Sequence, residues 1–141
     1  VKEAAEKIGE LPTRNIIDIY FNEICNIKGV FKLVNFDHIG EGKFTVEFNF
    51  RDKNYKMTGS GNGPIDACMD ALKQAGFERK LLYYKQIAMD EELLGSGANA
   101  MSVIHIEGDD GSKVIGRAIH KNTAVANVKA IFNAYNLIYK G

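Results

Sequence analysis

The amino-acid sequence predicts an α+β fold made of two βββα units, an internal pseudo-repeat whose sheets are covered by helices. Two observations lead to this prediction. Apolar side chains occupy every second position of residues 44–50, which is the period of a strand with one buried face. The order of three strand-like segments and one helical segment then occurs a second time within the 141 residues. A chain of this length is expected to form one main domain with its own core.

The first 28 residues are predicted to be a helical linker that precedes the main domain, residues 29–141. Apolar residues recur at helical spacing on both sides of Pro12, and Thr13 is a suitable N-cap for the second helical stretch. Gly29 is a suitable stop for that helix. Because the sequence begins at Val1, we expect it to be a piece of a longer protein.

The first βββα unit begins with an apolar run at residues 30–36, which we expect to end in a polar, glycine-containing turn at residues 37–42. The alternating segment 44–50 is the second strand. A third strand leads into a cluster of three glycines between residues 59 and 63. Apolar residues then recur at helical spacing over residues 65–75, which predicts a helix.

The second βββα unit has the same order of elements. A strand is expected to start near Glu78, and another occupies residues 101–107. After a tight turn at residues 108–111 comes a strand over residues 113–119. A long helix follows over residues 122–139, for which Asn122 or Thr123 is a suitable cap.

Composition excludes several classes of function. The 18 Lys and Arg residues balance the 18 Asp and Glu residues, so no overall field attracts nucleic acid or an anionic membrane. No apolar run approaches the ~20 residues that a membrane helix needs. The two cysteines, Cys25 and Cys68, do not form a disulfide framework. We therefore expect a cytoplasmic protein with reduced thiols that binds neither nucleic acid nor membranes.

The glycine cluster is the most informative local feature. Gly59, Gly61 and Gly63 stand before Pro64, a residue suited to the first position of a helix because it has no N–H to leave unpaired. Free N–H groups and the partial positive charge of a helix N-terminus favour a carboxylate or a phosphate there. The spacing fits neither a P-loop nor a dinucleotide fingerprint. A tight turn without a ligand is the alternative. The small residues at positions 95–100 could form one wall of a pocket, or they could be an ordinary flexible loop.

The spacing of histidine, cysteine and acidic residues does not indicate a metal site or a catalytic nucleophile. His38, His105 and His120 share no ligand spacing, and structural roles are expected for them. Cys68 lies on the apolar face of the predicted helix and is expected in the core. Asp66 suits the first turn of that helix because of the helix dipole, so it needs no acid–base role. We predict no catalytic and no metal-binding residues in this chain.

Residues 59–67, with the sequence Gly-Ser-Gly-Asn-Gly-Pro-Ile-Asp-Ala, are similar to the G-x-G-N-G-P signature of one known family. It is the regulatory domain of the 2-isopropylmalate synthases and the related citramalate synthases. Residues 81–89, 97–100 and 124–137 resemble further patterns of this family, in the same order. The resemblance covers about residues 30–139, and the first 28 residues resemble more weakly the helical subdomain that joins this domain to a barrel.

The resemblance implies an allosteric domain of two βββα units, paired as a homodimer, that binds the end product of a biosynthetic pathway. In the whole protein a (β/α)-barrel would condense acetyl-CoA with a 2-oxo acid such as 2-oxoisovalerate, using a divalent metal. This chain has no barrel, so we expect no catalysis and no cofactor in it. Leucine is the expected effector, and feedback inhibition of leucine biosynthesis the expected role.

The family motif also implies which residues hold leucine. One wall of the site is expected to consist of Gly61, Asn62, Gly63, Pro64, Ile65 and Ala67, and the other of Ala88, Gly97, Asn99 and Ala100. Two alternatives remain open at this stage. One is an isoleucine-sensing domain of a citramalate synthase, and the other is an unrelated α+β domain that binds a phosphate or nucleotide at the glycine cluster.

Overall fold

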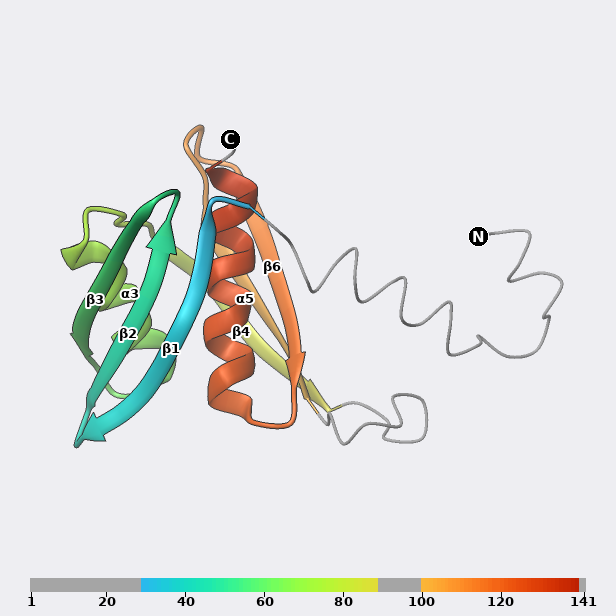
Figure 1. Cartoon of the computed structure of the whole chain (residues 1–141). Helices are drawn as coiled ribbons and strands as arrows, with labels where there is room; N and C mark the ends of the chain where they lie inside the picture. Colours follow the sequence, from blue (N-terminus) through green and yellow to red (C-terminus); the bar gives the residue numbers. More distant parts are fainter. Residues whose placement is uncertain (1–28, 89–99, 140–141) are drawn as a thin grey trace, which may run out of the picture.

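The computed structural model describes residues 29–88 and 100–139, and it confirms the predicted doubling of a βββα unit (Figure 1). The first unit contains β1 (Phe31–Gly40), β2 (Lys43–Phe50), β3 (Lys53–Ser60) and α3 (Pro64–Gln74). The second contains β4 (Leu81–Ala88), β5 (Ala100–Glu107), β6 (Lys113–His120) and α5 (Thr123–Ile138). The predicted helical linker, residues 1–28, lies outside the described residues.

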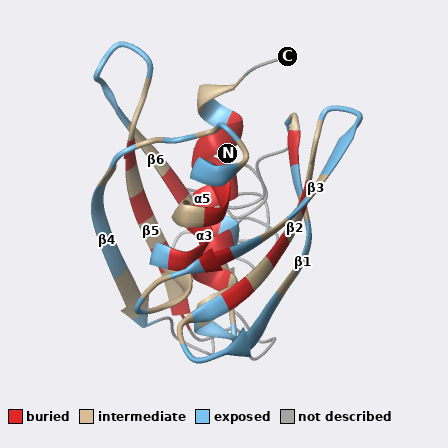
Figure 2. Cartoon of the chain, turned by 90° about the vertical axis from the view of Figure 1, so that its left-hand side faces the viewer, coloured by how far each residue is buried: buried red, intermediate tan, exposed pale blue. Residues whose placement is uncertain are grey.

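The two helices lie between two antiparallel three-stranded sheets (Figure 1, Figure 2). The strand orders are β1-β2-β3 and β4-β5-β6, so strands that are neighbours in each sheet are also consecutive in the sequence. Helix α3 packs on β3 and β2, and α5 packs on β6 and β5. Helix α5 also contacts α3 and β1, so the two units share one core.

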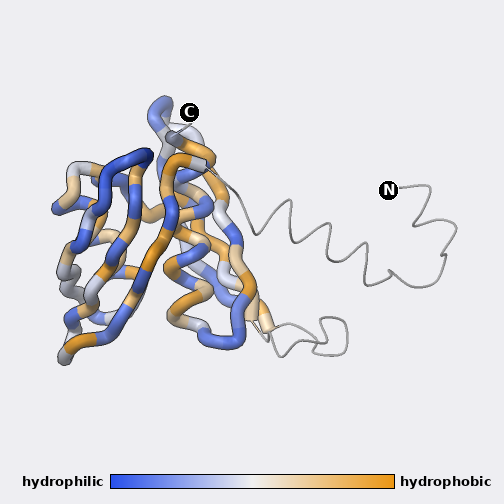
Figure 3. Tube along the Cα trace, viewed as in Figure 1, coloured by the Kyte–Doolittle hydropathy of each residue, from blue (hydrophilic) through white to orange (hydrophobic). Residues whose placement is uncertain are grey.

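Alternation along the strands decides which face of each sheet is buried. In β2 the side chains of Val46 and Phe48 are fully buried, whereas their neighbours are not. In β5 the side chains of Ser102, Ile104 and Ile106 are fully buried in the same alternating way. Figure 3 shows this alternation as changes between hydrophobic and hydrophilic residues along the strands. Each sheet therefore presents an apolar face to the helices.

Aromatic side chains fill the part of the core where the two units meet. The ring of Phe31 lies with its centroid 4.8–6.0 Å from six other rings, those of Phe48, Phe50, Phe77, Phe132, Tyr135 and Tyr139. The side chain of Asn136 in α5 binds both backbone groups of Phe31, with N–O distances of 2.7 and 3.0 Å. Strand β1 of the first unit is thus anchored to the last helix of the second.

Strand β1 is longer than the sequence suggested. The turn was expected over residues 37–42, but the strand continues to Gly40 and only Glu41 and Gly42 form the turn. The expectation was wrong because β1 is an edge strand whose second half is largely exposed, so polar residues occur there without ending it. Gly42 has a φ of 67°, which suits the turn to glycine.

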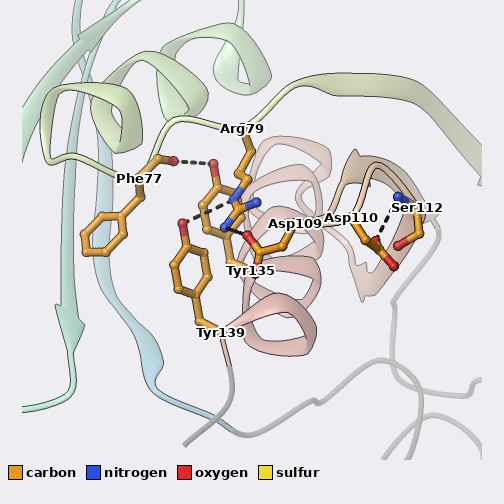
Figure 4. A network of polar contacts seen from close by, with 7 residues as sticks. All are labelled: Phe77, Arg79, Asp109, Asp110, Ser112, Tyr135 and Tyr139. Atoms are coloured by element: carbon orange, nitrogen blue, oxygen red, sulfur yellow. Dashed lines mark hydrogen bonds and ion pairs between the residues drawn. The ribbon is translucent and has the colours of Figure 1, made fainter.

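A second set of contacts joins the segment between the two units to the end of α5 (Figure 4). Tyr135 donates its hydroxyl proton to the backbone oxygen of Phe77 at 2.7 Å, and burial raises the pKa of this hydroxyl. The guanidinium of Arg79 bonds the Tyr139 hydroxyl at 3.2 Å and the Asp109 carboxylate at 2.7 Å. These bonds fix the start of the second unit against α5 and the β5–β6 turn.

Replacement of Tyr135 by Phe is expected to lower the free energy of unfolding by about 1–3 kcal/mol, because the Phe77 carbonyl loses its donor. Chemical denaturation monitored by circular dichroism measures the change. Tyr83→Phe is the matched control: Tyr83 is 47% exposed, and we expect its change to stay within about 0.5 kcal/mol. Equal stabilities of the two variants would contradict the role given to the Tyr135 hydroxyl.

Candidate functional site

A pocket of about 350 Å³ lies where the two units meet, beside the N-terminus of α3. This volume is at the lower end of the roughly 300–1,000 Å³ that small-molecule sites usually have. The first unit contributes the end of the glycine cluster and the first turn of α3, while the second unit contributes β4 and α5. The lining residues are Asn62, Gly63, Pro64, Ile65, Asp66, Leu81, Tyr84 and Asn127.

The N-terminus of α3 gives this pocket backbone hydrogen-bond donors. Pro64 occupies the start of the helix, as predicted, and Gly63 is the N-cap in an extended conformation with a φ of −166°. No side chain caps the helix. The first-turn N–H groups of Ile65 and Asp66 precede the first helical bond, which Ala67 donates to the Gly63 carbonyl.

Helix α5 differs from α3 at its N-terminus. The side-chain oxygen of Asn122 accepts a hydrogen bond from the backbone N–H of Val125 at 3.2 Å, which is an N-cap of the usual kind. This confirms one of the two predicted caps. The N-terminus of α3 has no such internal acceptor, so it is the helix end that can donate to an anion.

The three glycines before α3 have different roles. A Cβ at Gly59 would overlap the backbone oxygen of Ala67, and a Cβ at Gly61 would lie 2.5 Å from the Asp66 Cβ. The N–H of Gly61 already donates to the Gly42 carbonyl at 2.9 Å. These two glycines therefore allow strand and helix to approach closely. Only Gly63 borders open space, since a Cβ there would meet nothing within 4 Å.

The opposite side of the pocket is formed by the second unit. Leu81 and Tyr84 come from β4, where Tyr84 is 39% exposed, and Asn127 comes from α5. The interpretation of the sequence did not assign these three residues to the site. Leu81 and Tyr84 belong to a family motif that was recognised, so their spacing on the strand could have indicated them. Asn127 is part of a largely buried helix and carries no local signal.

The predicted first wall is partly at the pocket. Asn62, Gly63, Pro64 and Ile65 line it. Gly61 and Ala67 are not among the lining residues. Ala67 is fully buried against β3, and Gly61 lies behind the first turn of α3.

The predicted second wall lies further along the second sheet. Ala88 pairs with Ala100 across β4 and β5, as Tyr84 pairs with Ile104. Since alternate residues share a face, Ala88 is on the same face of β4 as Tyr84, beyond Gln86. Neither alanine lines the pocket. Gly97 and Asn99, the other two residues of this wall, are outside the described residues.

The lining residues include both polar groups and apolar side chains. Ile65, Leu81 and the ring of Tyr84 offer hydrocarbon surface, and Asp66 is the carboxylate among the described lining residues. The backbone N–H groups of the α3 first turn supply positive potential. The pocket therefore combines backbone N–H donors, an acidic side chain and an apolar wall, which are the elements needed to hold a small zwitterion with a hydrocarbon tail.

The described parts of the chain contain no candidate metal site, and their cysteine is buried. Within residues 29–88 and 100–139, no three His, Cys, Asp or Glu side chains are grouped as they would be around a metal ion. Burial raises the pKa of the Cys68 thiol, and the side chain is fully enclosed in the core as predicted. No helix in these ranges has the length and apolar character needed to cross a bilayer.

The histidines have local partners. His38 stacks on Phe44 and His105 lies against Tyr83, with ring centroids 4.6 and 4.8 Å apart. The Nδ1 atom of His120 accepts a hydrogen bond from the Asn122 N–H at 2.9 Å. Burial, and next the charges of lysine side chains, lower the pKa of His120.

Comparison with known proteins agrees with this architecture. Over 134 residues, or 93% of the chain, it is 34% identical to a 2-isopropylmalate synthase of Desulfitobacterium hafniense. Over 93 residues, or 65% of the chain, it is 40% identical to a 2-isopropylmalate synthase of a Parafrankia species. The aligned regions span only 24% and 16% of these two relatives.

The model of a protein family extends over the whole doubled unit. Residues 17–139 match the family described as the LeuA allosteric (dimerisation) domain. This range includes both βββα units, the glycine cluster and every residue that lines the pocket. Because the family model matches residues 17–139 and the fold agrees with that match, the chain belongs to the LeuA allosteric (dimerisation) domain family.

Proposed function

We propose that this chain is the regulatory part of a 2-isopropylmalate synthase and that it binds leucine for feedback inhibition. The pocket at the N-terminus of α3 is the observation that supports the proposal most directly, because both units contribute to it. The leucine carboxylate would accept hydrogen bonds from the first-turn N–H groups of α3. The apolar tail would lie against Ile65, Leu81 and Tyr84.

The energetics require contacts to both ends of the amino acid. Burial of a leucine side chain contributes only about 1.5–3 kcal/mol, whereas micromolar affinity requires about 8 kcal/mol. The remainder must come from the charged groups. The carboxylate would bind the α3 N–H groups, and the exposed side chain of Asp66, which lines the pocket, would attract the ammonium.

The parent enzyme is proposed from the relatives and from the resemblance. The chain corresponds to about a quarter or less of the 2-isopropylmalate synthases that it matches. Condensation of acetyl-CoA with 2-oxoisovalerate, and the divalent metal for it, would belong to a barrel outside the matched part. The chain itself would be non-catalytic and would act as a homodimer, in accordance with the description of its family.

Isothermal titration calorimetry with the 141-residue chain tests the ligand. We expect leucine to bind with a dissociation constant on the order of micromolar, and isoleucine more weakly. The opposite order would favour the isoleucine-sensing domain of a citramalate synthase. Inorganic phosphate serves as a control ligand: binding of phosphate without either amino acid would favour the phosphate or nucleotide hypothesis. If neither amino acid binds at millimolar concentration, the proposal is wrong.

A further inference from the structure

A largely buried polar network adjoins the pocket at Asn127. The hydroxyl of Ser102 in β5, which is fully buried, donates to the side-chain oxygen of Asn127 at 2.6 Å. The amide nitrogen of Gln86 in β4 donates to the same oxygen at 3.1 Å. Gln86 is further anchored by the Thr123 carbonyl at 3.4 Å, in the first turn of α5. Two strands and a helix thus converge on one side-chain atom.

This network sets the orientation of the Asn127 amide. Because Oδ1 accepts two hydrogen bonds from within the protein, Nδ2 is the group left to face away from them. Asn127 is only 6% exposed, and none of the described acceptors bonds its Nδ2 atom. Every fully buried side-chain polar atom of the described residues has a hydrogen-bond partner. Because the Nδ2 atom of Asn127 has none among these residues, it is not fully buried. The space that Asn127 borders is the pocket.

We propose that Asn127 is a ligand-binding residue whose Nδ2 donates a hydrogen bond to the carboxylate of the bound amino acid. The inference rests on the proposed function of the pocket. An amide nitrogen donates and does not accept, so it suits a carboxylate and cannot bind an ammonium group. One carboxylate oxygen would accept hydrogen bonds from the first-turn N–H groups of α3. The other would accept a hydrogen bond from the side-chain amide of Asn127 in α5.

The assignment gives the two strands a role in binding. Gln86 and Ser102 are positioning residues, because they hold the Asn127 oxygen and thereby direct its nitrogen to the pocket. A carboxylate bound to both α3 and α5 would connect the two βββα units through the ligand. An amino acid without a free carboxylate would lose this connection.

Asn127→Asp tests the inference, because it keeps an oxygen for Gln86 and Ser102 but replaces the donor with an acceptor. Leucine and leucinamide, in which the carboxylate is an uncharged amide, are titrated into the wild-type chain and the variant. We expect leucine to bind the variant roughly 100-fold more weakly, as hydrogen bonds to charged groups and like-charge contacts imply. Leucinamide binding should change by less than about fivefold, because its amide can donate to the new carboxylate.

Two further variants serve as controls. Asn127→Ala removes the donor without adding charge, and leucine affinity should fall roughly tenfold or more, even if Asn127→Asp folds poorly. Asn49→Asp is matched in chemistry, because the Asn49 oxygen also accepts a side-chain bond, from Asn54 at 2.8 Å, but it lies in β2 and does not line the pocket. Its affinity for leucine should equal that of the wild type.

The outcomes separate this inference from the proposed function. If leucine binds the wild type and both Asn127 variants equally well, Asn127 is not a ligand residue, although the pocket remains the leucine site. If both ligands weaken by the same factor in Asn127→Asp, the residue is structural and the inference is overturned. If the wild type binds no leucine, the proposed function fails, and the role of Asn127 fails with it.

Discussion

Gly63→Val is expected to abolish leucine binding, with a loss of at least about 100-fold, while the domain remains folded. Gly63 is the N-cap of α3 and lines the pocket, so a branched side chain there would occupy the space beside the first-turn N–H groups. The fold should tolerate the change, because a Cβ at Gly63 meets no atom within 4 Å and the φ of −166° is open to any residue. The poorer cap costs about 1 kcal/mol.

Calorimetry measures the loss of binding, and thermal unfolding followed by circular dichroism measures the fold. Gly40→Val is the matched control, because a Cβ at Gly40 also meets open space but the residue ends β1 and does not line the pocket. We expect leucine to bind this control as it binds the wild type. Unchanged affinity in Gly63→Val would mean that the ligand binds at another place.

Gly59→Ala is expected to destabilise the domain by about 3 kcal/mol, which is a substantial part of the roughly 5–15 kcal/mol by which a domain is usually stable. A single Cβ at this position would overlap the Ala67 oxygen and lie 3.2 Å from the Cβ of Ala71. Both belong to α3, which packs on β3 at this point. The helix would have to move away from the sheet, since backbone atoms cannot rotate out of the way.

Denaturation with guanidinium chloride measures this effect. Gly63→Ala is the same chemical change four residues later, where the Cβ meets open space, and its stability should stay within about 1 kcal/mol of the wild type. Gly116→Ala should repeat the effect of Gly59→Ala in the second unit, because its Cβ would overlap the Ala130 oxygen of α5. If Gly59→Ala were as stable as Gly63→Ala, the close packing of α3 on β3 would be wrong.

Most secondary-structure elements could be predicted because their signals are local. The alternation in residues 44–50 and 101–107 places every second side chain on one face, and the structure buries that face. Pro64 and Asn122 mark the starts of the two helices, because the missing N–H of proline and the capping side chain of asparagine act on residues that are adjacent in sequence. The end of β1 could not be predicted in this way, because an exposed edge strand has the same polar composition as a turn.

The candidate site could be predicted only on the side that is continuous in sequence. Asn62 to Ile65 were identified from the family motif, which coincides with a glycine cluster, a proline and a helix start that are adjacent along the chain. The different roles of Gly59 and Gly63 could not be told apart from the sequence. They depend on the three-dimensional surroundings, because Gly59 faces helix α3 and Gly63 faces open space. Leu81, Tyr84 and Asn127 became pocket residues through contacts between the units.

Periodicity and turn chemistry were thus sufficient to predict a doubled βββα unit, and the resemblance of short motifs indicated its kinship with a regulatory domain. They describe interactions between residues a few positions apart, which an extended or helical backbone brings together by itself. The pocket and the direction of the Asn127 amide depend on how α5 packs between the sheets and on its bonds to β4 and β5. Such contacts join distant residues, and they arise only when the whole core closes.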